Sequence, residues 1–335
     1  MGLLVYEFIT GGGMLGDALP ASLKREGELM RDALLRDLVA LHEITVSISC
    51  DPRCLPDSNL RDAEIIVAHA NETSDEFFQR VISNSKMLWP IAPESDGALE
   101  QLATTARKAG KIVLASDATT LACAASKRAT SRALNAAGVK CVPTFSAQDQ
   151  WPALPGLWVV KPDDGAGAIG IGLQANQDAA FQACIATSRV PLVAQPWLTG
   201  EALSLSMLCA NGQGLLLSVN RQHVLVNADE IKLVGITVNA LPRASKKFAQ
   251  LAQDISAALP GLWGYVGFDL ILANDELTVL EINPRLTTSY CGLREALDIN
   301  VAKLVLQLLE TDRLPEVTPT RNQSVKLDLS EHHVQ

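Results

Sequence analysis

GFDLILA at residues 267–273 and VLEINPR at residues 279–285 indicate two β-strands joined by a short loop, and therefore an antiparallel hairpin. Asp269 lies inside the first strand, between apolar residues. Glu281 and Asn283 lie at alternate positions of the second strand, so their side chains share one face. The pattern predicts oxygen-bearing side chains on one face of two otherwise apolar strands.

The loop length decides whether these side chains meet. With a three-residue loop at 274–276, Asp269 falls opposite Glu281, whereas a two-residue loop would place Asp269 opposite Leu280. The three-residue register gathers Asp269, Glu281 and Asn283 in one place. Two carboxylates this close repel each other unless a cation lies between them, and Mg²⁺ suits an all-oxygen site completed by waters and substrate phosphates. The alternative, a solvated sheet face, is weakened by the flanking apolar residues.

Arg285 follows the second strand directly. Its guanidinium could hold a phosphoryl group or a carboxylate through two parallel hydrogen bonds. An arginine after a strand is more often a surface ion pair, so the interest of Arg285 comes from its position beside the polar set.

A glycine-rich segment, GAGAIG at residues 165–170, matches the G-x-G-x-x-G pattern. A dinucleotide-binding fold requires a helix after this pattern, but the following IGIGL, residues 169–173, would make a poor helix. The segment instead predicts a flap between two antiparallel strands, at 158–161 and 169–173, whose backbone N–H groups could cover phosphate oxygens. Lys161 would supply a fixed cation. The alternative is a mobile hairpin with a surface lysine.

The rest of the chain divides near residue 118. Before it, apolar strands expected at 2–9, 43–49, 64–69, 85–90 and 111–115 alternate with helices at 23–41, from 74 and at 97–109, which predicts a parallel sheet covered on both faces. After it, a helix over 121–137, several hairpins and a last helix over 300–310 predict α+β architecture with antiparallel sheets. Residues from 318 onward form a polar tail without a predicted place.

Composition excludes several classes of protein. The 335 residues carry 28 Lys+Arg against 37 Asp+Glu, a net charge of −9, with 48% hydrophobic and 19% charged residues. Such a chain is not disordered, lacks the clustered cations of a non-specific nucleic-acid binder, and has no apolar run of about 20 residues for a membrane span. The N-terminus has no cationic region typical of a signal peptide. Seven scattered cysteines indicate reduced thiols, and together these features predict a cytoplasmic protein.

Residues 119–310 resemble the ATP-grasp superfamily in the order and approximate spacing of several motifs. These are Lys127, Lys161, the flap at 165–170, QPWLTGE at 195–201, Asp269 and EINPR at 281–285. The resemblance implies a substrate domain at 1–118, a central lobe at 119–197, a C-terminal lobe at 198–318 and a tail at 319–335. It also implies binding of ATP with two Mg²⁺ ions, or Mn²⁺ in their place.

The resemblance implies roles residue by residue. Lys127 and Lys161 would touch the ATP phosphates and the adenine edge, under the flap glycines Gly165, Gly167 and Gly170. Gln195 and Leu198 would form the hinge that binds adenine, and Glu201 would hold the ribose hydroxyls. Asp269, Glu281 and Asn283 would ligate the metal, with Arg285 near the transferred phosphate. Many relatives carry an arginine where this chain has Gly267, so Arg285, Arg243 or Arg294 would supply that charge.

The N-terminal segment resembles the tyramine–glutamate ligase group, which is associated with methanofuran synthesis and has relatives in methylotrophic bacteria. The resemblance rests on VYEFITGGG at 5–13, SLKREGELM at 22–30 and LRDL at 35–38. Glu7, Gly11, Gly12 and Gly13 would contact substrate, because glycines at the end of such a strand sit where open α/β sheets bind ligands; the alternative is a tight turn.

These resemblances imply an ATP-dependent carboxylate–amine ligase acting on small molecules. It would join the γ-carboxylate of glutamate to tyramine or tyrosine through an acylphosphate, without a nucleophilic residue. A ligase for another amino-acid or peptide pair is the alternative enzyme, and a nucleotide-binding regulatory module is the non-catalytic one. The oligomeric state is open, with a homo-oligomer compatible with the sequence.

Overall fold

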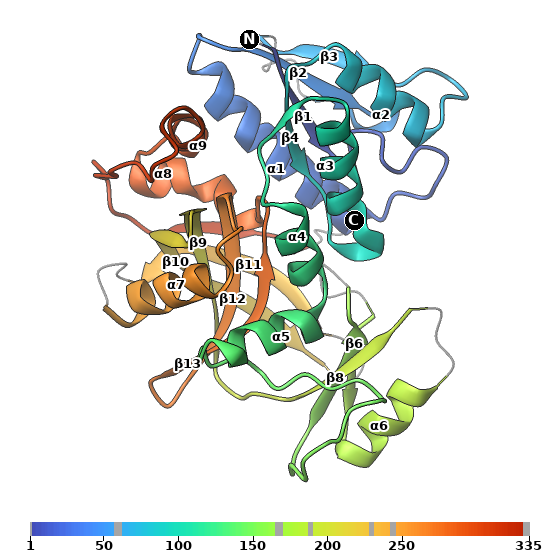
Figure 1. The fold of residues 1–335 in the computed structure, drawn as a ribbon, viewed down its shortest axis with the longest axis vertical. Coiled ribbons are helices and arrows are strands. Elements are labelled where there is room, and N and C mark those ends of the chain that lie inside the picture. Colours follow the sequence, from blue (N-terminus) through green and yellow to red (C-terminus); the bar gives the residue numbers. More distant parts are fainter. Residues whose placement is uncertain are drawn as a thin grey trace.

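The computed structural model describes residues 2–56, 62–164, 170–186, 190–227, 231–241 and 246–330. An N-terminal parallel sheet is followed by a three-stranded and a six-stranded antiparallel sheet. In Figure 1 the parallel sheet lies at the top, the six-stranded sheet in the centre and the small sheet below it to the right. The predicted fold class is therefore confirmed. None of the helices in the described ranges combines the length and apolar character needed to span a membrane.

The parallel sheet has the strand order β3-β2-β1-β4-β5. Its strands are β1 (Gly2–Glu7), β2 (Thr45–Cys50), β3 (Glu64–Val67), β4 (Met87–Ile91) and β5 (Ile112–Val113), and its helices are α1 (Ala21–Val39), α2 (Ser74–Ser83) and α3 (Ala98–Lys108). Alternate residues of β1 enter two cores: Leu3 and Val5 pack with α1, and Leu4 and Tyr6 pack with α2 and α3. Because both faces are covered, the strand is apolar throughout.

Two helices connect this sheet to the second half of the chain. The sequence predicts one helix over 121–137, but the structure has α4 (Ala118–Ala125) and α5 (Lys127–Ala136). The break is at Ser126, whose Oγ accepts a hydrogen bond from the Ala129 amide at 3.0 Å and so caps α5. Lys127 therefore begins a helix, and its amide donates to the Asp163 carbonyl at 3.1 Å.

The small sheet has the order β7-β6-β8 and is antiparallel. It consists of β6 (Trp158–Pro162), β7 (Gly172–Gln174) and β8 (Leu192–Pro196), with α6 (Gln177–Ile185) beside it. Trp151 stacks on Trp158 with ring centroids 5.2 Å apart. This aromatic packing gives the small sheet a core of its own.

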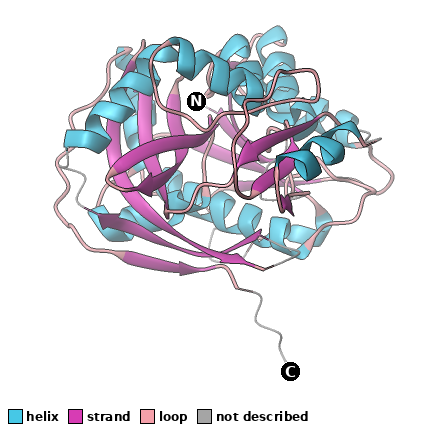
Figure 2. Cartoon of the chain, turned by 90° about the horizontal axis from the view of Figure 1, so that it is seen from below, coloured by secondary structure: helices cyan, strands magenta, loops and turns pink. Residues whose placement is uncertain are grey.

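The large sheet has the order β13-β12-β9-β10-β11-β14. Its strands are β9 (Glu201–Ala210), β10 (Gln213–Val226), β11 (Ile231–Leu241), β12 (Gly264–Ala273), β13 (Glu276–Asn283) and β14 (Val325–Asp328). The helices of this region are α7 (Lys246–Ala258), α8 (Leu293–Leu297) and α9 (Val301–Thr311). Figure 2 shows the strands lying among helices when the molecule is seen from below. Strand β14, from the segment that the sequence leaves unplaced, pairs with β11.

The β12–β13 hairpin corrects the predicted three-residue loop and its pairing of Ala273 with Leu277, and it confirms the predicted pairing of Asp269 with Glu281. The turn has two residues, Asn274 and Asp275, both with positive φ (49° and 65°), and Ala273 pairs with Glu276. A β-bulge then shifts the register between Asp269 and Leu270, so that Asp269 faces Glu281 and Leu280 is the extra residue. Because the turn and the bulge compensate each other, the two carboxylates still meet.

Candidate active site

Asp269 and Glu281 form the acidic centre of the candidate site. They are opposite each other in the β12–β13 ladder. Asn283 Nδ2 donates to Asp269 Oδ2 at 3.0 Å, and Gln222 Nε2 donates to Asp269 Oδ1 at 2.9 Å. Burial, reinforced by the negative charge of Glu281, raises the pKa of Asp269 to about 7. A carboxylate whose ionisation is disfavoured by burial and by a neighbouring negative charge marks a place where a cation would relieve repulsion.

Two buried lysines face these carboxylates. Lys127 Nζ, at the start of α5, lies 3.5 Å from Glu281 Oε1. Lys161, on β6, is 9% exposed. Burial lowers the pKa of Lys161 to about 8; Glu281 opposes this shift and the nearby Lys127 adds to it. Helix α5 and strand β6 thus bring positive charge close to the carboxylates of the β12–β13 hairpin.

The donor set fits Mg²⁺. It offers two carboxylates and one amide oxygen. Since the described residues hold no cluster of three or more His, Cys, Asp or Glu side chains placed to hold a metal, two carboxylates are the charged donors that the protein supplies here. A site of one or two carboxylates, completed by water and phosphate oxygens, is the usual arrangement for Mg²⁺. The protein would therefore provide only part of the coordination shell, and a bound phosphate would provide more.

A cavity of about 590 Å³ lies between the small sheet and the large sheet. Apolar residues form much of its wall, including Val159, Ile271 and Leu280. The predicted Lys161, Gln195, Leu198 and Glu201 all line it. Its size and its apolar walls with few polar groups are typical of a small-molecule site.

Two of the residues predicted to bind the nucleotide, Gln195 and Glu201, are held by contacts of their own. Gln195 Nε2 donates to Thr144 Oγ1 at 2.9 Å, and Gln195 is buried. Glu201 forms an ion pair with Arg221 at the rim of the same cavity. Of the predicted flap, Gly170 lies at the start of a described range, whereas Gly165 and Gly167 lie outside the described residues.

Arg285 makes a contact that sequence analysis misses. Its Nε and Nη2 donate to the two carboxylate oxygens of Glu94, each at 2.9 Å, and the side chains are only 14% and 3% exposed. Burial lowers the pKa of Arg285, but the charge and hydrogen bonds of Glu94 more than offset this, so the net shift is upward. Arg285 therefore connects the large sheet to the N-terminal region.

Of the other two candidate arginines, Arg294 is the one within the described residues, and it pairs with a different carboxylate. Arg294 Nη1 pairs with Asp37 at 3.0 Å and lines a different cavity, and Arg243 lies outside the described residues. Steric crowding explains why glycine stands at position 267. A Cβ added there would lie 2.5 Å from Thr287 Cγ2. The Thr287 side chain occupies the space that a larger residue at position 267 would need.

A second cavity, of about 390 Å³, lies where the N-terminal sheet meets the lobes and is lined by both Glu7 and Arg285. Glu7 Oε2 accepts hydrogen bonds from the Thr10 amide at 2.6 Å and the Thr10 hydroxyl at 2.7 Å. Burial raises the pKa of Glu7, although these hydrogen bonds oppose the shift. The predicted glycines form the turn after β1, where the Gly11 amide donates to the Glu7 carbonyl at 2.6 Å and the Gly13 amide to the Phe8 carbonyl at 2.8 Å. Gly12 lies between them in the same turn.

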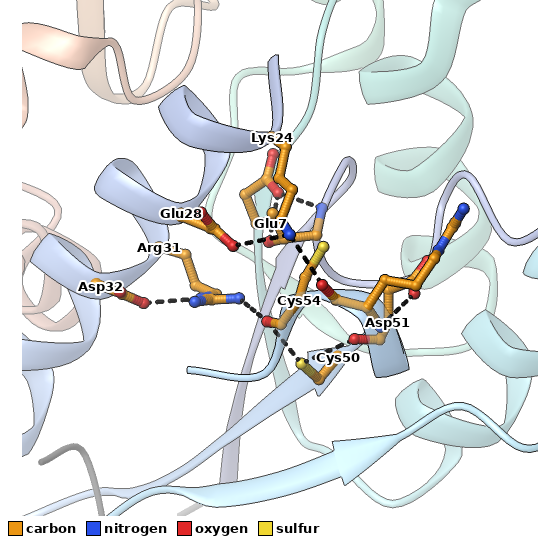
Figure 3. A network of polar contacts seen from close by, with 10 residues as sticks. Glu7, Lys24, Glu28, Arg31, Asp32, Cys50, Asp51 and Cys54 are labelled. Atoms are coloured by element: carbon orange, nitrogen blue, oxygen red, sulfur yellow. Dashed lines mark hydrogen bonds and ion pairs between the residues drawn. The ribbon is translucent and has the colours of Figure 1, made fainter. Parts of the chain in front are cut away.

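A polar network beside Glu7 fixes α1 against the sheet (Figure 3). Arg31, 2% exposed, donates from Nη1 to the Cys54 carbonyl at 2.7 Å and from Nε to Asp32 at 2.8 Å. Cys50 Sγ donates to the same Cys54 carbonyl at 3.2 Å. The contact of Arg31 with the Cys54 carbonyl holds α1 in place. The preceding turn of α1, with Glu26 and Gly27, lines the second cavity.

The comparisons with known proteins agree with this geometry. The ATP-grasp domain model matches residues 124–289, and the pre-ATP-grasp 3 domain model matches residues 44–121. An ATP-grasp superfamily protein from Archaeoglobus fulgidus superposes with a TM-score of 0.73 at 22% identity, over 98% of this chain and 92% of that chain. The biotin carboxylase domain of 2-oxoglutarate carboxylase from Hydrogenobacter thermophilus, solved with Mg-ADP and bicarbonate, gives 0.69 at 14% identity, over 96% and 71%.

The fold, the paired carboxylates and the facing lysines define an ATP-grasp enzyme, and the chain belongs to the ATP-grasp superfamily as one of its carbon–nitrogen ligases. Within that superfamily it is similar to the tyramine–L-glutamate ligase of Methanocaldococcus fervens. The two are 26% identical over 321 residues, which span 93% of this chain and 95% of that protein.

Proposed function

We propose that the protein activates the γ-carboxylate of glutamate with ATP and joins it to the amine of tyramine or tyrosine, in the synthesis of a one-carbon carrier of the methanofuran or methylofuran type. One observation carries the proposal. The Asp269–Glu281 pair has two buried lysines beside it; one of them, Lys161, lines a nucleotide-sized cavity, and Arg285, just after the same hairpin, lines a second cavity at the N-terminal sheet. Similarity to a tyramine–L-glutamate ligase over nearly its whole length supports the choice of substrates.

Several predicted residues take roles in this proposal. ATP occupies the 590 Å³ cavity, with adenine at Gln195 and Leu198 and ribose at Glu201. Lys127 and Lys161 bind phosphate oxygens. Asp269, Glu281 and Asn283 hold Mg²⁺, which would neutralise phosphate charge when bound. Arg285, held by Glu94, lines the second cavity.

The chemistry follows from the poor reactivity of a carboxylate toward an amine. A γ-carboxylate oxygen attacks the γ-phosphorus of ATP, and ADP leaves with the electrons of the broken P–O bond. The amine nitrogen then attacks the acyl carbon, phosphate leaves with the C–O electrons, and the nitrogen loses a proton. Positioning and charge stabilisation are enough for both steps. The protein therefore requires no nucleophilic side chain.

The test is a ligation assay with purified protein, ATP, Mg²⁺, glutamate and either amine. We expect ADP, phosphate and an amide that mass spectrometry detects. Glu281→Gln should lower the rate by at least about a hundredfold. The matched control, Glu276→Gln, lies on the same strand but is exposed and pairs with Lys140, so its rate should stay within about twofold of wild type. No amide with either amine would refute the proposed substrates.

A further inference from the structure

The second cavity has an apolar body that no predicted role uses. Its volume of about 390 Å³ is enough for a small organic molecule. Its apolar side chains come mainly from the turn after β1, from α1, and from the end of β4 with the residues after it. They are Phe8, Ile9, Met14, Leu23, Met30, Ile91, Ala92 and Pro93. Methionine and aromatic side chains of this kind pack well against a ring.

Two carboxylates from different elements reach this apolar body. Glu7, 2% exposed, comes from the end of β1, and Glu26 comes from the first half of α1. Thr288 Oγ1 donates to Glu26 Oε2 at 3.0 Å and so orients that carboxylate. The helix comes so close that a Cβ added at Gly27 would lie 2.6 Å from Glu7 Oε2. Both carboxylates thus line the same cavity, where the Thr10 donors hold Glu7 and Thr288 holds Glu26.

The cavity offers little competing positive charge. Within the described ranges, Arg285 is the only lysine or arginine that lines it, and Glu94 already accepts two hydrogen bonds from its guanidinium. Asp96 and Asp164 add negative charge, and the Asp96 amide donates to Asp164 Oδ2 at 3.0 Å. A cavity with apolar walls and a negative field favours a cation carried on an apolar body.

We propose that this cavity binds the amine co-substrate, a primary arylalkylamine, with its ammonium group at Glu26 and Glu7 and its ring against the apolar wall. This rests on the proposed function and adds where the amine binds and which residues select it. Glu26 is the main contact, since three donors from the β1 turn already occupy the carboxylate of Glu7. Tyramine and tyrosine share this chemistry, so both belong in the test.

The test pairs a change in the protein with a change in the ligand. Calorimetry and ligand-detected NMR, with Mg-ADP present, measure the Kd of tyramine, of tyrosine and of 4-ethylphenol, which keeps the ring of tyramine but lacks the amine. Glu26→Gln keeps the shape of the side chain and removes its charge. We expect it to raise the Kd of tyramine, or of tyrosine, at least about tenfold, because hydrogen bonds to charged groups are the strong ones. The Kd of 4-ethylphenol should change by less than about twofold.

Glu28→Gln is the matched control, because Glu28 lies on the same helix, pairs with Lys24 at 3.8 Å and does not line the cavity. It should leave every Kd within about twofold of wild type. An equal effect of Glu26→Gln on tyramine and 4-ethylphenol, no effect on either, or no binding of either amine to the wild type would overturn the proposal. Amine binding that depends on Glu26 without any ADP release would refute the ligase function and leave this site standing. If the Glu26→Gln variant forms the amide as well as the wild type does, the amine site is refuted and the ligase function stands.

Discussion

The buried Glu94–Arg285 pair joins residues 191 positions apart and should stabilise the contact between the N-terminal region and the large sheet. Because Glu94 is buried and Arg285 is only 14% exposed, removing one charge takes from the other the partner that it contacts directly, in a site of low polarity. Breaking such a pair costs about 3–5 kcal/mol, whereas replacing both partners together is often close to neutral. Glu94→Gln and Arg285→Met should each lower the free energy of unfolding by about that amount.

A double-mutant cycle tests this energy directly. Urea unfolding followed by far-ultraviolet circular dichroism gives the free energy for wild type, the two single variants and Glu94→Gln/Arg285→Met. The double variant should be more stable than the sum of the single losses predicts, with a coupling energy above about 1 kcal/mol. The exposed Lys140–Glu276 pair provides the control cycle, with side chains 57% and 68% exposed and a coupling of about 0–1 kcal/mol. If the loss of unfolding free energy in the double variant equals the sum of the two single losses to within about 0.5 kcal/mol, the Glu94–Arg285 pair contributes no stability of its own.

Three further variants test separate features. Gly267→Ala should cost about 1–3 kcal/mol of unfolding free energy through its clash with Thr287, and adding Thr287→Ser should restore much of that loss; a neutral Gly267→Ala would contradict the steric account. Ser49→Ala should raise the unfolding free energy by about 1 kcal/mol, because Ser49 Oγ is buried without a hydrogen-bond partner among the described residues, and a destabilised variant would reveal a partner. Lys161→Met should raise the KM for ATP at least about tenfold in a steady-state ADP assay with the circular dichroism spectrum unchanged; an unaltered KM would remove Lys161 from the phosphate site.

Local patterns were enough to predict the acidic centre. Asp269 and Glu281 lie in one hairpin, so alternation and strand length place them on one face without knowledge of the rest of the fold. The loop itself was predicted with one residue too many, because a bulge at Leu280 cannot be distinguished in sequence from a longer turn. The break at Ser126 carried a signal, since serine is a preferred helix cap.

Contacts between distant segments were beyond the reach of local patterns. Glu94, Gln222 and Glu26 each contact a residue from a different part of the chain, and nothing in their neighbouring residues marks them. Strand β14 was missed for a similar reason: its four residues make a strand only because the edge of β11 is there to pair with them. The resemblance to a known family singled out Lys127 as a lysine that contacts ATP, which spacing alone would not have done.

The fate of one oxygen atom tests the central claim, that ATP activates the carboxylate as an acylphosphate. Glutamate labelled with ¹⁸O in its γ-carboxylate is incubated with the protein, ATP, Mg²⁺ and the amine, and mass spectrometry measures the label in the released phosphate. Because phosphate leaves with the oxygen that attacked ATP, one ¹⁸O should appear in each phosphate formed with amide. Amide formed together with unlabelled phosphate would contradict the acylphosphate and, with it, the roles proposed for this site.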